Sequence, residues 1–156
     1  MLLVFVLTGC TNQLSIPESS EDTEYAFHQA FAYQYGLGGV PVSGKLADEW
    51  YKKAVVTGNS KYLNCYAFFL ATTEESQYRD GEKAMGLMNN VQEKTKVEFY
   101  HKDTLAAVLA ELGKYKEAAK TQEEAIRKMP SDVLPERRMK FHMRLNSYQK
   151  EKPWRE

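Results

Sequence analysis

The pattern that decides the fold lies in residues 99–130, FYHKDTLAAVLAELGKYKEAAKTQEEAIRKMP. Apolar side chains recur there every three or four residues, which predicts two amphipathic helices. Gly113 separates the two helices, and Pro130 ends the second. Ala118 and Ala125 are small enough to let the helices approach closely, while Tyr115 fills the turn. The stretch therefore predicts a closely packed helix pair.

Working outward, the same helical spacing begins at Glu24 and continues through most of the chain. No stretch alternates polar and apolar residues between hairpin turns, so we expect no sheet. Gly58 suits a left-handed helix C-cap, and the glycines between 36 and 41 cannot continue a helix. The predicted helices cover roughly 24–35, 44–57, 61–73, 81–95, 100–112, 115–129 and 135–150. The expected fold class is all-α.

Length, charge and cysteine content exclude several classes of protein. The chain has 156 residues, of which 43% are hydrophobic, which is enough for one domain with a core. Its 21 basic and 21 acidic residues cancel, so nucleic acid is not an expected partner. Two cysteines exclude a disulfide framework and a four-thiolate zinc site.

The first residues, MLLVFVLTGC, form an apolar run followed by small residues and Cys10. The run has the shape of a secretory signal and is too short to span a bilayer. Residues 11–22 are polar and cannot bury enough apolar surface to fold, so they are expected to form a tether. We expect a signal peptide over 1–9, a lipidated Cys10 with a flexible tether over 10–23, and a helical domain over 24–156.

The segment L-T-G-C, residues 7–10, resembles the lipobox of bacterial lipoproteins. That resemblance implies cleavage before Cys10, a diacylglyceryl thioether on its sulfur and acylation of the new N-terminus. By the same resemblance, Thr11 after the cysteine favours sorting to the outer membrane, with the domain facing the periplasm. The alternative is a hydrophobic N-terminus on a cytosolic protein.

Residues 99–130 resemble the tetratricopeptide repeat (TPR), which places Gly, Tyr, Ala, Ala and Pro at these spacings. The family usually has an aromatic residue where this chain has Gln122. Residues 26–60 resemble a Sel1-like repeat through Gly38, Gly39, Ala47, Trp50, Ala54 and Gly58. Between these two stretches we expect a third, middle repeat, in which the loop between the two helices is lengthened and covers residues 73–80. The resemblance implies a short α-solenoid of about three helix-turn-helix repeats, closed by a C-terminal capping helix within 131–156.

Catalytic chemistry is not indicated by the residues. His28, His101 and His142 are far apart in sequence, and none has a second ligand at metal-binding spacing. Cys65 is flanked by aromatic residues on a predicted helix, which suggests a buried, inert thiol. We expect no catalytic, cofactor-binding or metal-binding residues, and a protein that is not an enzyme. The alternative is an enzyme, or a subunit of one, that uses Cys65 or a histidine.

The repeat resemblance implies that the first helix of each pair lines a concave groove. By this resemblance, the residues expected to contact a partner are Phe27, Phe31, Gln34, Asn64, Phe68, Tyr100, Asp103 and Glu111, with Ala71 and Ala107 beside them. Aromatic anchors with a few polar neighbours suit a bound peptide or helix. Two alternatives stay open: the rings pack against adjacent helices, or the tether or the closing helix fills the groove.

The function expected from these features is a non-catalytic scaffold for protein–protein interaction. A lipid anchor would hold its peptide-binding groove at the membrane, and analogy suggests a role in assembling envelope complexes. The alternative is a structural subunit of an enzyme or of a secretion or pilus machine. Residues 131–156 carry seven bases and four acids, with Met139 and Met143 on one face. Such a helix could contact a partner or lipid surface, or could be an ordinary solvated cap.

Overall fold

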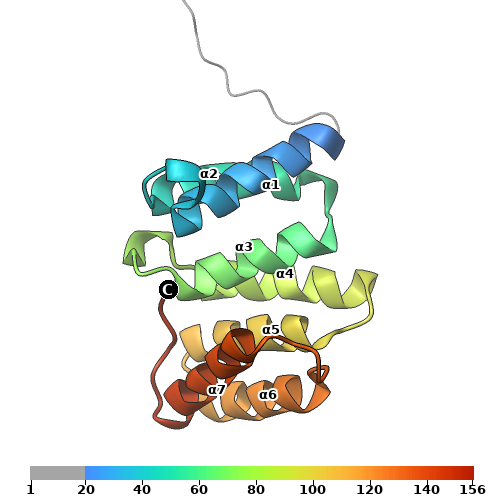
Figure 1. Cartoon of the computed structure of the whole chain (residues 1–156), viewed down its shortest axis with the longest axis vertical. Coiled ribbons are helices and arrows are strands. Elements are labelled where there is room, and N and C mark those ends of the chain that lie inside the picture. The colour runs from blue at the N-terminus through green and yellow to red at the C-terminus, as the bar shows by residue number, and fades with distance from the viewer. Residues whose placement is uncertain (1–19) are drawn as a thin grey trace, which may run out of the picture.

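The computed structural model describes residues 20–156, and in that range it contains seven α-helices and no β-strand (Figure 1). The all-α prediction is therefore confirmed. The helices are α1 (Ser20–Tyr35), α2 (Gly44–Ala54), α3 (Ser60–Thr72), α4 (Gly81–Lys94), α5 (Phe99–Glu111), α6 (Tyr115–Lys128) and α7 (Pro135–Gln149).

One predicted boundary is wrong, because α1 begins at Ser20, inside the range assigned to the tether. Glu21 and Asp22 lie in its first turn, where negative charge is favoured by the helix dipole. Thr23 is buried, so this turn also packs onto the domain. Residues 1–9 and Cys10, to which the signal peptide and the lipid were assigned, lie outside the described residues.

The first six helices form three consecutive pairs, α1 with α2, α3 with α4, and α5 with α6. The pairs lie one above the other in Figure 1, with α3 packed on α5 and α7 crossing in front of the last pair. The chain then turns back, and its C-terminal end lies beside α3 (Figure 1).

Two glycines make the sharp turns between helices possible. Gly58 ends the turn after α2 with φ of 68°, and Gly113 separates α5 from α6 with φ of 75°. Both values fall in the left-handed region, which side chains with a Cβ atom rarely adopt. The short connections keep successive helices adjacent, so each can cover its apolar face against the next.

Large aromatic side chains fill the middle of the core. The rings of Tyr51 and Tyr66 are stacked with their centroids 5.3 Å apart, and Phe69 packs against both. The Tyr66 hydroxyl donates to the buried carboxylate of Asp48 at 2.7 Å and accepts from Lys83. This satisfies polar groups that would otherwise be costly to bury. The face of α3 that carries Tyr66 and Phe69 is thus committed to packing.

Candidate functional site: an open groove

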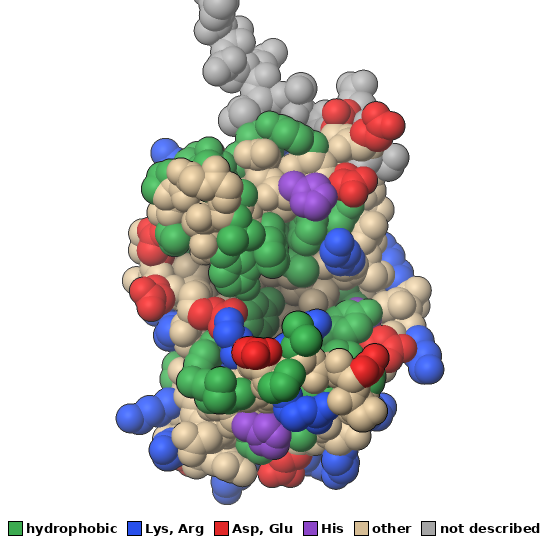
Figure 2. Space-filling view, viewed as in Figure 1, with side chains coloured by type: hydrophobic (Ala, Val, Ile, Leu, Met, Phe, Trp, Pro, Cys, Tyr) green, Lys and Arg blue, Asp and Glu red, His purple; other side chains and the backbone are tan. Residues whose placement is uncertain are grey.

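A groove of about 880 Å³ opens on the face shown in Figure 2. Its hollow is mainly hydrophobic in that view, with charged side chains at the rim. The walls come mostly from α1, α3, α5 and α7. The side chains that line the groove include Phe31, Gln34, Tyr35, Leu37, Lys61, Asn64, Cys65, Phe68, Tyr100, Asp103, Leu134, Glu136, Arg137, Lys140, Arg144 and Glu156.

Apolar side chains line both the interior and the mouth of the groove. Phe31 and Phe68 are half-buried and lean on the core, which leaves part of each ring facing the groove. At the mouth, four large side chains remain exposed although they are mostly apolar. They are Tyr35, Leu37, Tyr100 and Leu134, with exposed fractions of 36%, 48%, 37% and 69%. Apolar side chains gathered around a concavity are typical of an interaction site.

Six of the eight residues expected to contact a partner line the groove: Phe31, Gln34, Asn64, Phe68, Tyr100 and Asp103. Their role in binding stays a prediction. Asn64 is buried, and its Oδ1 atom has no hydrogen-bond donor within the described part of the chain. A buried polar atom without a partner is costly, so such an atom is more readily explained beside a ligand site than in a core.

Phe27 and Glu111 do not line the groove. Phe27 is only 5% exposed, and its ring stacks on Tyr62 with centroids 4.6 Å apart. Glu111 forms ion pairs with Arg79 and Arg155. Both placements follow from neighbours that are distant in sequence. Ala71 and Ala107, which were expected beside the contacts, are buried in the core.

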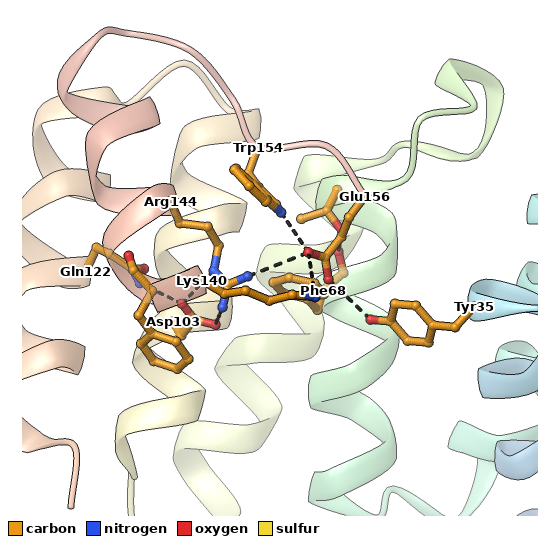
Figure 3. Close-up of polar contacts among 10 residues, drawn as sticks. Tyr35, Phe68, Asp103, Gln122, Lys140, Arg144, Trp154 and Glu156 are labelled. Carbon is orange, nitrogen blue, oxygen red and sulfur yellow. Dashed lines mark hydrogen bonds and ion pairs between the residues drawn. The ribbon is translucent and has the colours of Figure 1, made fainter. Parts of the chain in front are cut away.

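Asp103 lines the groove but is already bound by its neighbours (Figure 3). Its carboxylate accepts two hydrogen bonds from Arg144, each 2.9 Å long, and one from the Gln122 amide at 2.6 Å. Gln122 also donates to the Phe141 carbonyl and is fully buried. Gln122 therefore ties α6 to α5 and α7. Burial raises the pKa of Asp103, although Arg144 acts in the opposite direction.

The groove is also bounded by α7, as the alternative of a closing helix in the groove predicts, and by the C-terminal segment, residues 154–156. Arg144 and Lys140 reach the groove from α7, and the Glu156 carboxylate lies close to both (Figure 3). The Glu156 carboxylate also accepts from Trp154 at 2.8 Å and from the Tyr35 hydroxyl at 3.4 Å. The sequence signals for this wall were the predicted closing helix and the excess of basic residues after 131.

The C-terminal segment is held by the end of α3. The Glu156 amide donates to the Thr72 carbonyl at 2.9 Å, and the Arg155 guanidinium donates to the Ala71 carbonyl at 3.1 Å. The last carbonyls of a helix lack partners within that helix, so these bonds cap α3. One end of the groove is thus occupied by the protein's own residues, while the rest stays open.

Comparisons with known proteins find no match. No protein-family model fits this sequence, and no curated protein or solved structure is significantly similar to it. The groove and its chemistry are therefore the basis for inferring a function.

Reactive groups near the groove are few. Within residues 20–156, no three His, Cys, Asp or Glu side chains gather closely enough to hold a metal ion. Burial raises the pKa of the Cys65 thiol to about 11, against an ordinary value near 9. Burial also lowers the pKa of His101, whose Nδ1 accepts from the Glu98 amide. No helix in the same range is long and apolar enough to cross a bilayer.

The raised pKa of Cys65 predicts slow reaction with thiol reagents. In a chain carrying Cys10→Ser, Cys65 is the only thiol. At pH 8 we expect it to react about 100-fold more slowly than in the urea-unfolded chain, because thiolate is the reactive form. The rate should rise about tenfold per pH unit up to pH 10. Release of thionitrobenzoate from a disulfide reagent measures this, and equal rates in folded and unfolded chains would contradict it.

Proposed function

We propose that this protein is a non-catalytic, lipid-anchored scaffold that binds a polypeptide segment in its groove. The observation that carries the proposal is the open groove of about 880 Å³, with half-buried Phe31 and Phe68 inside and exposed apolar side chains at its mouth. Aromatic anchors in a partly desolvated concavity are the usual source of binding energy at protein interfaces. The groove is open and is lined by residues of several helices, which suits a bound peptide or helix.

The finer architecture belongs to the same proposal. We infer that the three helix pairs form a short α-solenoid of the TPR and Sel1-like kind, with α7 as the capping helix. The support is the spacing of Gly113, Tyr115, Ala118, Ala125 and Pro130, together with the stacking of three successive pairs. In such stacks each unit buries its apolar face against its neighbours, and the first helices are left to line a binding surface.

Membrane attachment is proposed from residues 1–10 alone. We infer a bacterial lipoprotein signal peptide, acylation of Cys10, and a domain that faces the periplasm from the outer membrane. Two or more acyl chains would hold the protein stably, since each buried methylene contributes about 0.8 kcal/mol. Anchoring would raise the effective concentration of the groove for partners near the membrane, as suits envelope complex assembly.

A second candidate is a structural subunit that oligomerises through α7. Met139 and Met143 support it, since they are 58% and 47% exposed on that helix. Sedimentation at two protein concentrations distinguishes the candidates. A mass that increases with concentration and returns to the monomer value in a Met139→Lys, Met143→Lys variant would favour oligomerisation.

Crosslinking in the native host tests the groove. We expect Phe31→Ala combined with Phe68→Ala to lose the partners recovered with the wild-type protein, because both anchors are removed. The matched control is Tyr25→Ala with Val56→Ala, which truncates exposed apolar side chains outside the groove. Circular dichroism must show that both variants fold. If the Phe31, Phe68 variant recovers as many partners as the control variant, the groove is not the binding site.

A further inference from the structure

The groove carries more positive than negative side chains. Four cationic residues line it: Lys61, Arg137, Lys140 and Arg144. Three acidic residues line it, namely Asp103, Glu136 and Glu156. Asp103 is bound by Arg144, and Glu156 lies near Lys140 and Arg144. Two of the three acids, Asp103 and Glu156, therefore offset the charges of Lys140 and Arg144.

Lys61 and Arg137 have no acidic partner among residues 20–156. The Lys61 ammonium lies 4.9 Å from the centre of the Phe27 ring, and the Arg137 guanidinium lies 5.6 Å from the centre of the Phe99 ring. Lys61 comes from α3 and Arg137 from α7, so the two charges reach the groove from different walls. Both act on Cys65: burial raises the pKa of its thiol, and these two charges partly offset that effect.

Glu156 shows how this groove holds a carboxylate. Its side chain enters at one end, where it meets the Trp154 indole N–H, the Tyr35 hydroxyl and two cations of α7 (Figure 3). The rings of Tyr35, Phe68 and Trp154 lie beside that charge, so the groove accommodates a carboxylate next to aromatic side chains (Figure 3). Glu136 also lines the groove, but it forms no ion pair with Lys61 or Arg137.

We propose that the groove selects an acidic polypeptide segment, whose apolar side chains contact Phe31 and Phe68 and whose Asp or Glu side chain pairs with Lys61 and Arg137. The proposal rests on the proposed function and specifies the partner by charge complementarity. Charges at the edge of an apolar interface mainly provide selectivity and faster association. The apolar contacts would supply most of the affinity.

Three synthetic peptides with blocked termini test the charge preference. They share one pattern of Leu and Phe, and the intervening positions are Glu, Gln or Lys. The full chain carrying Cys10→Ser is titrated by calorimetry, and protection of Cys65 from a thiol reagent reports occupancy of the groove. We expect the Glu peptide to bind roughly fivefold to tenfold more tightly than the Gln peptide, with the Lys peptide weakest. This preference should vanish between about 50 mM and 500 mM salt.

A charge-removal variant assigns the effect to the two side chains. Lys61→Gln with Arg137→Gln should bind the Glu and Gln peptides equally, with affinity for the Gln peptide unchanged. The matched control is Lys45→Gln with Lys116→Gln, which removes two exposed charges outside the groove and should keep the preference. Lys61→Glu with Arg137→Glu should reverse the preference, so that the Lys peptide binds more tightly than the Glu peptide.

The outcomes separate this proposal from the proposed function. If the Glu and Gln peptides bind equally and Phe68→Ala weakens both, polypeptide binding stands and the acidic preference is refuted. If no peptide protects Cys65, the proposal is refuted, while the crosslinking test still decides the proposed function. Protection by phosphatidylglycerol vesicles but by no peptide would assign the groove to lipid. Protection that rises with protein concentration alone would assign it to a second copy of the chain.

Discussion

Arg144→Ala is expected to lower the free energy of unfolding by about 3–5 kcal/mol, measured by urea denaturation at pH 7. The variant leaves the buried Asp103 carboxylate without its two 2.9 Å hydrogen bonds. Breaking one side of a buried ion pair is costly because the remaining charge has lost its water and gained no replacement. Gln122 alone still donates to that carboxylate.

Two further variants identify the cause of this loss. Arg138→Ala removes a guanidinium on the same helix that donates an exposed hydrogen bond to the Pro130 carbonyl, so it should cost less than about 1 kcal/mol. Adding Asp103→Asn to Arg144→Ala removes the buried charge and should restore part of the stability. If Arg138→Ala costs as much as Arg144→Ala, the buried pair is not the reason.

The loss in Arg144→Ala should also depend on pH. Burial already raises the pKa of Asp103, and removing Arg144 raises it further. The folded state then binds the proton more tightly than the unfolded state, so the variant regains stability as pH falls through the folded-state pKa. Denaturation at pH 7 and pH 5 should show a smaller difference from the wild type at pH 5. A larger difference at pH 5 would contradict this sign.

Phe69→Ala should cost about 3–5 kcal/mol of stability, while Phe68→Ala should cost only about 1 kcal/mol. The two residues are adjacent on α3 but face different surroundings. Phe69 is 1% exposed and packs against Tyr51 and Tyr66, so its removal leaves a cavity. Phe68 is half-buried in the groove wall, where water can fill the space.

The same two variants should have opposite effects on partner recovery. At a temperature where both are folded, Phe68→Ala should lose partners and Phe69→Ala should keep them. Thermal denaturation and crosslinking measure the two effects on the same samples. Equal stability losses would show that the groove wall is packed as tightly as the core.

Helix positions could be predicted from local sequence, since periodicity, glycine turns and Pro130 act over a few residues. The predicted helices match α2 to α7 closely, and α1 was missed only at its start. Six of the eight residues predicted to contact a partner do line the groove, because residues spaced along the first helix of each pair share a face. Phe27 has the same spacing, yet Tyr62 covers it from α3.

Local sequence was enough to predict that residues 20–156 are helical and where α2 to α7 lie, because these depend on contacts within one or two turns. The packing of the helices sets which faces stay open, how α7 and residues 154–156 bound the groove, and where its charges are paired. Arg144 meets Asp103 across 41 residues, and Arg155 meets Ala71 across 84. Bonds between such distant residues depend on how the helices stack, and no local pattern encodes that arrangement.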